Sequence, residues 1–229
     1  MIRTNSRAAE RFLQAARVPC TLAPQIFGGW TIRRDPLPGL RFLHRRWAHL
    51  GWSDYTVLFR TEPVLKEPDW DNIHRVRDDG KVEELDVVME DSPRELSKHL
   101  PIWMAARGRI LVTGLGLGCV ARGLLASPAV EHIDVVEIDP EIIRVIGPEF
   151  TGNDRVTIHL ADALQFEAAG RQWNFAWHDI WTPENKGLHE QHARLIGRFR
   201  STSMPQGAWQ FPRPFKRQLR RELIGGFLG

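Results

Sequence analysis

From residue 109 onward, the hydrophobic and polar positions of the chain follow two alternating periods. Short apolar runs, of the length typical of buried strands, are separated by segments in which apolar residues recur every three or four positions, as in helices. The short runs predict strands at residues 109–114, 132–139, 155–162, 173–180 and 207–211. The segments between them predict helices at residues 119–127, 140–147 and 188–199. Strands that alternate with helices predict a mainly parallel sheet with helices on both faces.

The pattern before residue 92 is different. Residues 51–91 alternate as strands do and contain the turn signal Asp79-Gly80, so we expect a small antiparallel β unit there. Residues 1–50 read as a basic, proline-punctuated arm with one short helical pattern at residues 6–17. Ser92 opens a capping box that predicts a helix start, and Pro101 should break or kink that helix. The expected parts are therefore residues 1–50, 51–91 and 92–229.

Composition narrows the class of protein. With 42% hydrophobic and 26% charged residues among 229, the chain has the make-up of a globular domain. No apolar run approaches the roughly 20 residues that span a bilayer, and no secretory signal is visible, so we expect a cytoplasmic protein without membrane association. Cys20 and Cys119 are too few for a disulfide framework or a zinc site. His189 and His192 stand three apart, whereas the zinc pattern HExxH needs four, and no metal is expected.

The net charge of +3 hides an uneven distribution of cations. The first 50 residues contain nine arginines but only two acidic residues, Glu10 and Asp35. The tail after residue 212 contains five more basic residues. The N-terminal arginines are Arg3, Arg7, Arg11, Arg17, Arg33, Arg34, Arg41, Arg45 and Arg46. Basic patches attract polyanions, so nucleic acid is a candidate partner of these arms. A solubilising surface is the alternative interpretation.

The strongest chemical signal begins at Arg109, where an apolar strand runs into a GxGxG turn and then into a helix. Glycines at this turn permit positive φ angles and let backbone N–H groups approach a ligand. Such a helix start favours a carboxylate or a phosphate. The turn comprises Gly114, Leu115, Gly116 and Gly118.

Two carboxylates follow at the ends of the next predicted strands. Glu137 stands nineteen residues after Gly118 (137 − 118), where a carboxylate can accept hydrogen bonds from both ribose hydroxyls. Asp162 ends the third strand and could accept from an exocyclic adenine amine. Three successive strand ends with these features predict an adenosine-containing cofactor.

The form of the turn separates two cofactor classes. Dinucleotide folds prefer GxGxxG or GxGxxA, but the third small position would here be Cys119. The GxGxG form and the Glu-x-Asp and Asp-Ala strand ends together resemble class I S-adenosylmethionine-dependent methyltransferases. The segment VVEIDPEII resembles the spermidine synthase branch of that fold. The resemblance covers about residues 92–211 and implies a Rossmann-like three-layer α/β sandwich that binds S-adenosylmethionine.

The resemblance also implies roles for single residues. Gly114, Gly116 and Gly118 would line the methionine moiety, and Glu137 would hold the ribose. Asp162 and Ala163 would contact the adenine ring, and we count Leu115 and Ile138 among the cofactor-binding residues.

Two departures from the family pattern stand out. Thr113 occupies a position where many methyltransferases have an acid that contacts the methionine amino group. The chain after residue 113 is also long enough for five alternating strands but too short for the usual sixth and seventh.

The fourth predicted strand ends in Trp177-His178-Asp179, where this fold places the transferring methyl group. Methyl transfer depends mostly on positioning, and a base helps if the acceptor carries a proton. Asp179 is the preferred base and His178 the second candidate. Trp177 and Trp181 could clamp an acceptor or belong to the core.

Three functions stay open. Methyl transfer to an unidentified acceptor is the first. Spermidine synthase-like aminopropyl transfer is the second, weakened because Glu184 is the only acid shortly after Asp179. A non-catalytic cofactor-binding module that holds nucleic acid or a partner protein is the third. The number of subunits also stays open, with a homodimer among the alternatives.

Overall fold

The computed structural model describes residues 6–36, 50, 52–60, 74–76, 82–84, 87–180, 188–203 and 205–208. The chain divides into two units, which we describe one at a time. The first combines Met1–Arg17 with Leu96–Gly229, and the second is Val18–Glu95. This division differs from the expected boundaries after residues 50 and 91, because the first helix joins the C-terminal unit and the following residues join the β unit.

The second unit is an antiparallel sheet in the order β1-β2-β3-β6, with a separate pair of strands β4 and β5. Its strands are β1 (Gln25–Phe27), β2 (Trp30–Pro36), β3 (Asp54–Arg60), β4 (His74–Val76), β5 (Val82–Glu84) and β6 (Val87–Glu90). The antiparallel β unit expected from residue 51 is therefore present. The predicted Asp79-Gly80 turn lies outside the described residues, between β4 and β5.

Strands β1 and β2 were not expected within the basic arm, and for β2 the reason is a buried ion pair. Arg33 and Asp35 lie two residues apart on one face of β2, and both are almost completely buried. The Arg33 guanidinium donates to both carboxylate oxygens of Asp35, from Nε at 2.5 Å and from Nη2 at 2.6 Å. Because the buried face of this strand is charged, its period of two does not appear as a hydrophobic alternation.

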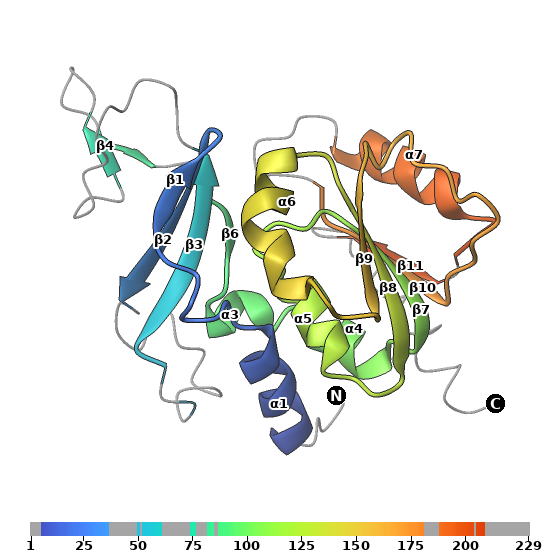
Figure 1. The fold of residues 1–229 in the computed structure, drawn as a ribbon, viewed down its shortest axis with the longest axis horizontal. Coiled ribbons are helices and arrows are strands. Elements are labelled where there is room, and N and C mark those ends of the chain that lie inside the picture. Colours follow the sequence, from blue (N-terminus) through green and yellow to red (C-terminus); the bar gives the residue numbers. More distant parts are fainter. Residues whose placement is uncertain are drawn as a thin grey trace. The chain divides into compact units, whose positions relative to one another are not determined.

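The first unit is a Rossmann-like three-layer sandwich around a five-stranded parallel sheet. The strand order among the described residues is β11-β10-β7-β8-β9, and every neighbouring pair is parallel. Helices α5 and α6 cover one face of the sheet and α7 covers the other (Figure 1). Helix α1 packs against α4 and α5, although it lies some distance away in the sequence. The predicted α/β class is confirmed.

The elements of this unit match the predicted segments closely. The helices are α1 (Ser6–Ala16), α3 (Pro93–Leu96, at the boundary between the units), α4 (Leu100–Ala105), α5 (Cys119–Leu125), α6 (Pro140–Ile146), the 3-10 helix η2 (Gly147–Phe150) and α7 (Leu188–Phe199). The strands are β7 (Gly108–Thr113), β8 (Val130–Glu137), β9 (Val156–Leu160), β10 (Phe175–His178) and β11 (Gln206–Ala208). None of the described helices is long and apolar enough to cross a membrane.

The predicted helix start at Ser92 is confirmed. The Ser92 hydroxyl accepts a hydrogen bond from the backbone N–H of Glu95 at 3.2 Å, as an N-cap does. Pro101 was expected to break this helix, but α3 already ends at Leu96. Pro101 instead stands in the first turn of α4, where its missing N–H leaves no bond unmade.

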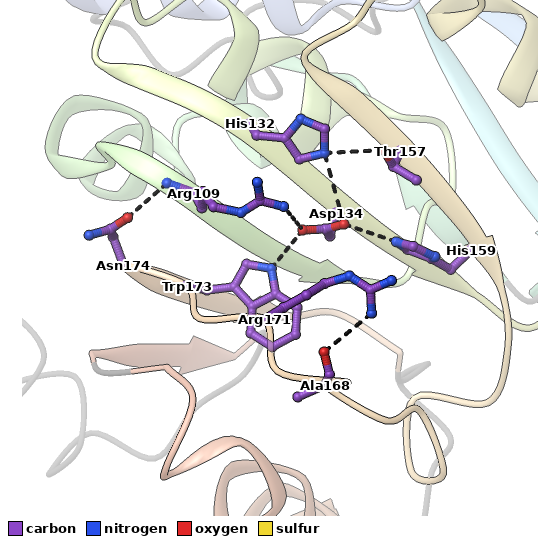
Figure 2. Close-up of polar contacts among 9 residues, drawn as sticks. All are labelled: Arg109, His132, Asp134, Thr157, His159, Ala168, Arg171, Trp173 and Asn174. Carbon is purple, nitrogen blue, oxygen red and sulfur yellow. Dashed lines mark hydrogen bonds and ion pairs between the residues drawn. The ribbon is translucent and has the colours of Figure 1, made fainter.

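One face of the sheet contains a polar network around Asp134, a buried carboxylate on β8 (Figure 2). His159 Nε2 donates to it at 2.9 Å, Trp173 Nε1 at 2.8 Å and Arg109 Nη2 at 3.1 Å. Burial by itself would raise the pKa of Asp134, but the hydrogen bonds from these three side chains outweigh it and hold the pKa below its ordinary value. The network therefore ties β7, β8, β9 and the approach to β10 through a single anion.

Candidate functional site

The glycine turn connects β7 to α5 at the carboxyl edge of the parallel sheet. Gly114, Gly116 and Gly118 all have positive φ angles, of 93°, 50° and 77°. A Cβ on Gly114 would overlap the backbone carbonyl oxygen of Asp179. The backbone N–H of Asp179 donates to the carbonyl of Thr113 at 2.8 Å, which holds the end of β10 against the turn. Glycine is therefore required at residue 114 both for its conformation and for this close approach.

Glu137, at the end of β8, is in direct contact with the turn. Its Oε2 accepts a hydrogen bond from the backbone N–H of Leu115 at 2.7 Å, and its Oε1 accepts one from the N–H of Asp139 at 2.9 Å. The side chain is 8% exposed. A carboxylate has about four acceptor positions, so two bonds from the backbone leave room for hydroxyl donors. The structure thus joins the glycine turn and the first predicted carboxylate.

The second acid of the Glu-x-Asp pattern has a different task. Asp139 is the N-cap of α6, and its Oδ1 accepts from the backbone N–H of Glu141 at 2.8 Å. Ile138, between the two acids, is 65% exposed. Exposed large apolar side chains are few among the described residues, and one of them is next to the predicted site.

Leu160 is a second exposed apolar residue at this edge, and sequence reasoning missed it. It is 61% exposed and is the register partner of Glu137 in the parallel pair of β8 and β9. Ile138 and Leu160 therefore lie at the carboxyl ends of neighbouring strands. The signal that could have identified it was an apolar residue near the end of the predicted strand at residues 155–162, two positions before the Asp162-Ala163 pair.

Asp162 and Ala163 follow β9 at the same edge. The Asp162 carboxylate accepts from the backbone N–H of Leu164 at 2.8 Å and from the side-chain amide of Gln165 at 3.0 Å, so it caps the turn that follows the strand. Ala163 is 4% exposed, and its side chain packs in the core beside α7. Asp162 thus lies at the expected edge, whereas the Ala163 methyl group faces inward.

His178 and Thr113 belong to a buried hydrogen-bond chain across three strands. Both are completely buried, and Thr113 Oγ1 lies 3.0 Å from His178 Nδ1. His178 Nε2 lies 2.9 Å from Gln206 Oε1, while the Gln206 amide donates to the carbonyl of Ile196 at 3.0 Å. The Gln206 oxygen therefore accepts from His178 Nε2–H, and His178 Nδ1 accepts from the Thr113 hydroxyl.

This environment does not fit a proton-accepting role for His178. Burial lowers the pKa of His178 to about 4; the bond to Gln206 opposes this shift and His192 adds to it. A base needs access to the proton it removes, and both ring nitrogens of His178 are engaged inside the sheet. The hydroxyl of Thr113 is likewise engaged by His178 inside the sheet.

Asp179 is the remaining candidate base. It is half-buried at the end of β10, with its backbone against Gly114. Trp177, on the opposite face of β10 from His178, is 8% exposed and meets the ring of His99 edge-on at 5.7 Å between centroids. Trp177 therefore packs in the core, and Trp181 lies outside the described residues.

Two arginines of the N-terminal basic segment form their contacts within the β unit. Arg34 donates to the carbonyl of Pro19 at 3.0 Å and lies 3.5 Å from the Asp54 carboxylate, and Arg33 is the buried partner of Asp35. These two arginines are therefore used within the β unit. Arg41, Arg45, Arg46 and the basic tail lie outside the described residues.

Comparison with known proteins finds no matching family model. Ribosomal RNA small subunit methyltransferase A of Pseudomonas fluorescens is 39% identical over 59 residues, 26% of this chain and 21% of that protein. Polyamine aminopropyltransferase of Agathobacter rectalis is 35% identical over 100 residues, 38% of this chain and 35% of that protein. The chain thus spans about a fifth to a third of these relatives. Because relatives of both kinds match, the resemblance to class I S-adenosylmethionine-dependent methyltransferases, with spermidine synthase-like motifs, is confirmed.

Solved structures overlap with the chain only partially. A dimethyladenosine transferase from Plasmodium falciparum is 19% identical and covers 51% of this chain and 40% of its own, with a TM-score of 0.38. Human methyltransferase-like protein 13, solved in complex with SAH, is 22% identical and covers 46% of this chain and 54% of its own, with a TM-score of 0.36.

Proposed function

We propose that this chain binds S-adenosylmethionine at the carboxyl edge of its parallel sheet and transfers the methyl group to an acceptor. The proposal starts from its resemblance to class I S-adenosylmethionine-dependent methyltransferases. The observation that carries the proposal is the contact between Glu137 and the glycine turn. A buried carboxylate aimed at a bend of three positive-φ glycines suits a nucleoside whose ribose hydroxyls donate to it.

The residues present fit the cofactor in three respects. Glu137 retains acceptor capacity after its two backbone bonds. Ile138 and Leu160 offer exposed apolar surface beside it, as binding sites for planar bases do. Asp162 supplies a carboxylate at the next strand end. S-adenosylmethionine, when bound, would supply the electrophilic methyl group.

The test of cofactor identity is calorimetric titration with S-adenosylmethionine and, in parallel, with NAD. We expect saturable binding of S-adenosylmethionine and no binding of NAD at equal concentration. The reverse preference would contradict the proposal, because it would indicate a dinucleotide site.

For the transfer step, we assign proton removal from the acceptor to Asp179. The backbone of Asp179 lies against Gly114. Its Cα is therefore at the edge of the sheet where the glycine turn and the end of β10 meet. Catalysis here is mainly positioning, with the base needed only for an acceptor that loses a proton.

For the acceptor, we infer ribosomal RNA. The support is that several matching relatives are ribosomal RNA methyltransferases and that the chain has a net positive charge concentrated in its end segments. The alternative, aminopropyl transfer, is favoured by the polyamine aminopropyltransferase relatives.

One assay separates the two reactions. The protein is incubated with methyl-labelled S-adenosylmethionine and purified ribosomal RNA, and separately with decarboxylated S-adenosylmethionine and putrescine. We expect label in RNA and no spermidine. Formation of spermidine without RNA labelling would replace methyl transfer by aminopropyl transfer.

A further inference from the structure

Arg122, on α5, reaches back to the glycine turn that precedes its own helix. Its Nη2 donates to the backbone carbonyl of Leu117 at 2.6 Å. Its Nη1 forms an ion pair with Glu149 of η2, and its Nε donates to the carbonyl of Ala16 at 3.4 Å. The side chains of Arg122 and Glu149 are only 11% and 16% exposed. One largely buried cation thus connects the glycine turn, η2 and the last turn of α1.

The same guanidinium accounts for the third glycine of the motif. A Cβ on Gly118 would lie 3.0 Å from Arg122 Nη1 and 2.9 Å from Cζ of Phe150. Both distances are shorter than ordinary van der Waals contact. Glycine at residue 118 therefore leaves space for the Arg122 guanidinium beside the turn. It also allows the positive φ angle of this residue.

The turn is held from two sides. Glu137 accepts the N–H of Leu115 at the start of the turn, and Arg122 donates to the carbonyl of Leu117 near its end. Fixing a backbone residue before a ligand arrives removes an ordering cost that binding would otherwise have to overcome. Both contacts keep the segment between them, including Gly116, in one conformation.

We propose that Arg122, with its partner Glu149, is a positioning residue of the cofactor site, and that helix α1 contributes to the site through it. This inference rests on the proposed function for its effect on cofactor affinity. Arg122 acts through the shape of residues 115–118, which it contacts at the carbonyl of Leu117. The N-terminal helix, far from the glycine motif in sequence, then belongs to the binding machinery.

Arg155 offers a matched control within the same unit. Its guanidinium donates to the carbonyls of Leu125 at 3.3 Å, Ser127 at 2.9 Å and Val130 at 2.5 Å, so it secures the loop at the opposite end of α5. Arg122 and Arg155 therefore share residue type, partial burial and carbonyl partners. They differ in which loop they hold, and Arg122 in addition forms the ion pair with Glu149.

The experiment compares Arg122→Ala, Arg155→Ala and the milder Glu149→Gln, each in the full chain. Hydrogen–deuterium exchange reports the protection of residues 115–118 and of residues 126–130, and titration with S-adenosylmethionine reports the Kd. We expect Arg122→Ala to lose protection in the glycine turn and to raise the Kd about 10-fold or more, the equivalent of ordering about one residue. Arg155→Ala should lose protection only at residues 126–130 and leave the Kd within about twofold.

Glu149→Gln keeps the shape of the partner and should shift both readouts in the same direction as Arg122→Ala, by less. Equal increases of Kd in Arg122→Ala and Arg155→Ala would overturn the inference, since the effect would then be general destabilisation. An unchanged Kd in Arg122→Ala would overturn it as well. If the wild-type protein does not bind S-adenosylmethionine, the proposed function fails; unaltered turn protection in Arg122→Ala would instead refute the positioning role itself.

Discussion

At the scale of single residues, the buried Glu137 carboxylate accepts one hydrogen bond from the backbone of Leu115 in the glycine turn and another from the backbone of Asp139. We expect Glu137→Ala to weaken S-adenosylmethionine binding by roughly 1.5–3 kcal/mol, the range for hydrogen bonds to a charged group. That range corresponds to a roughly 10- to 150-fold increase in Kd. Calorimetric titration measures it, with Glu141→Ala, on the adjacent helix, as the control. A Kd within about twofold of the wild-type value would remove Glu137 from the site.

A substitution at Asp179 should separate cofactor binding from methyl transfer. Asp179→Asn preserves the size of the side chain and should leave the Kd for S-adenosylmethionine nearly unchanged. Transfer to a proton-bearing acceptor should fall by roughly 10²- to 10⁴-fold, the usual contribution of a positioned base. Labelled methyl incorporation into ribosomal RNA provides the rate, and Asp154→Asn at an exposed turn is the control. Full activity in Asp179→Asn would show that another group, or none, takes the proton.

At the scale of elements, His178 connects three parallel strands through Thr113 on β7 and Gln206 on β11. Its pKa is lowered to about 4 in the folded protein, against about 6.5 in the unfolded chain. Between these pH values the unfolded chain binds a proton that the folded protein does not, so acid favours unfolding. The contribution of His178 to stability is complete above pH 6.5 and is lost as the pH falls to about 4.

Denaturant unfolding across this window measures the effect. The free energy of unfolding should decrease by about 3 kcal/mol between pH 6.5 and pH 4 on account of His178. In His178→Gln this component of the slope should disappear, whereas replacement of the more exposed His132 by Gln should retain it. The same slope in His178→Gln and in the wild type would mean that His178 is not a source of the acid sensitivity.

The Asp134 network also connects elements of the sheet. The Asp134 carboxylate accepts hydrogen bonds from side chains on three different segments (Figure 2). Asp134→Asn keeps the shape but replaces an acceptor oxygen by a donor that faces donors. We expect a loss of roughly 1.5–3 kcal/mol in the free energy of unfolding at neutral pH. Urea denaturation measures it beside Asp154→Asn, and a loss below about 0.5 kcal/mol, the size of an ordinary surface effect, would contradict this account.

At the scale of the whole molecule, one unit is built from both ends of the chain. Met1–Arg17 joins Leu96–Gly229, with Val18–Glu95 inserted as a β unit of its own. The described part of the sheet contains five parallel strands, and its carboxyl edge collects the glycine turn, Glu137, Asp162 and Asp179. Each of these groups lies at or just after the carboxyl end of a parallel strand. Residues that are distant in the sequence therefore meet at the carboxyl edge of the sheet.

The sequence alone was sufficient for the alternating strands and helices from residue 109 onward, because apolar strands and helical spacing repeat locally and the glycine turn has its own signature. Its elements and the edge occupied by Glu137 follow from that pattern. Other features depended on contacts between distant residues. Strand β2 has a face made polar by the Arg33–Asp35 pair, His178 is engaged by Thr113 and Gln206, and Arg122 links the turn to α1. The periodicity of a sequence shows which positions are apolar. It does not show which polar side chains form hydrogen bonds with residues distant in sequence, because only the tertiary structure brings those residues together.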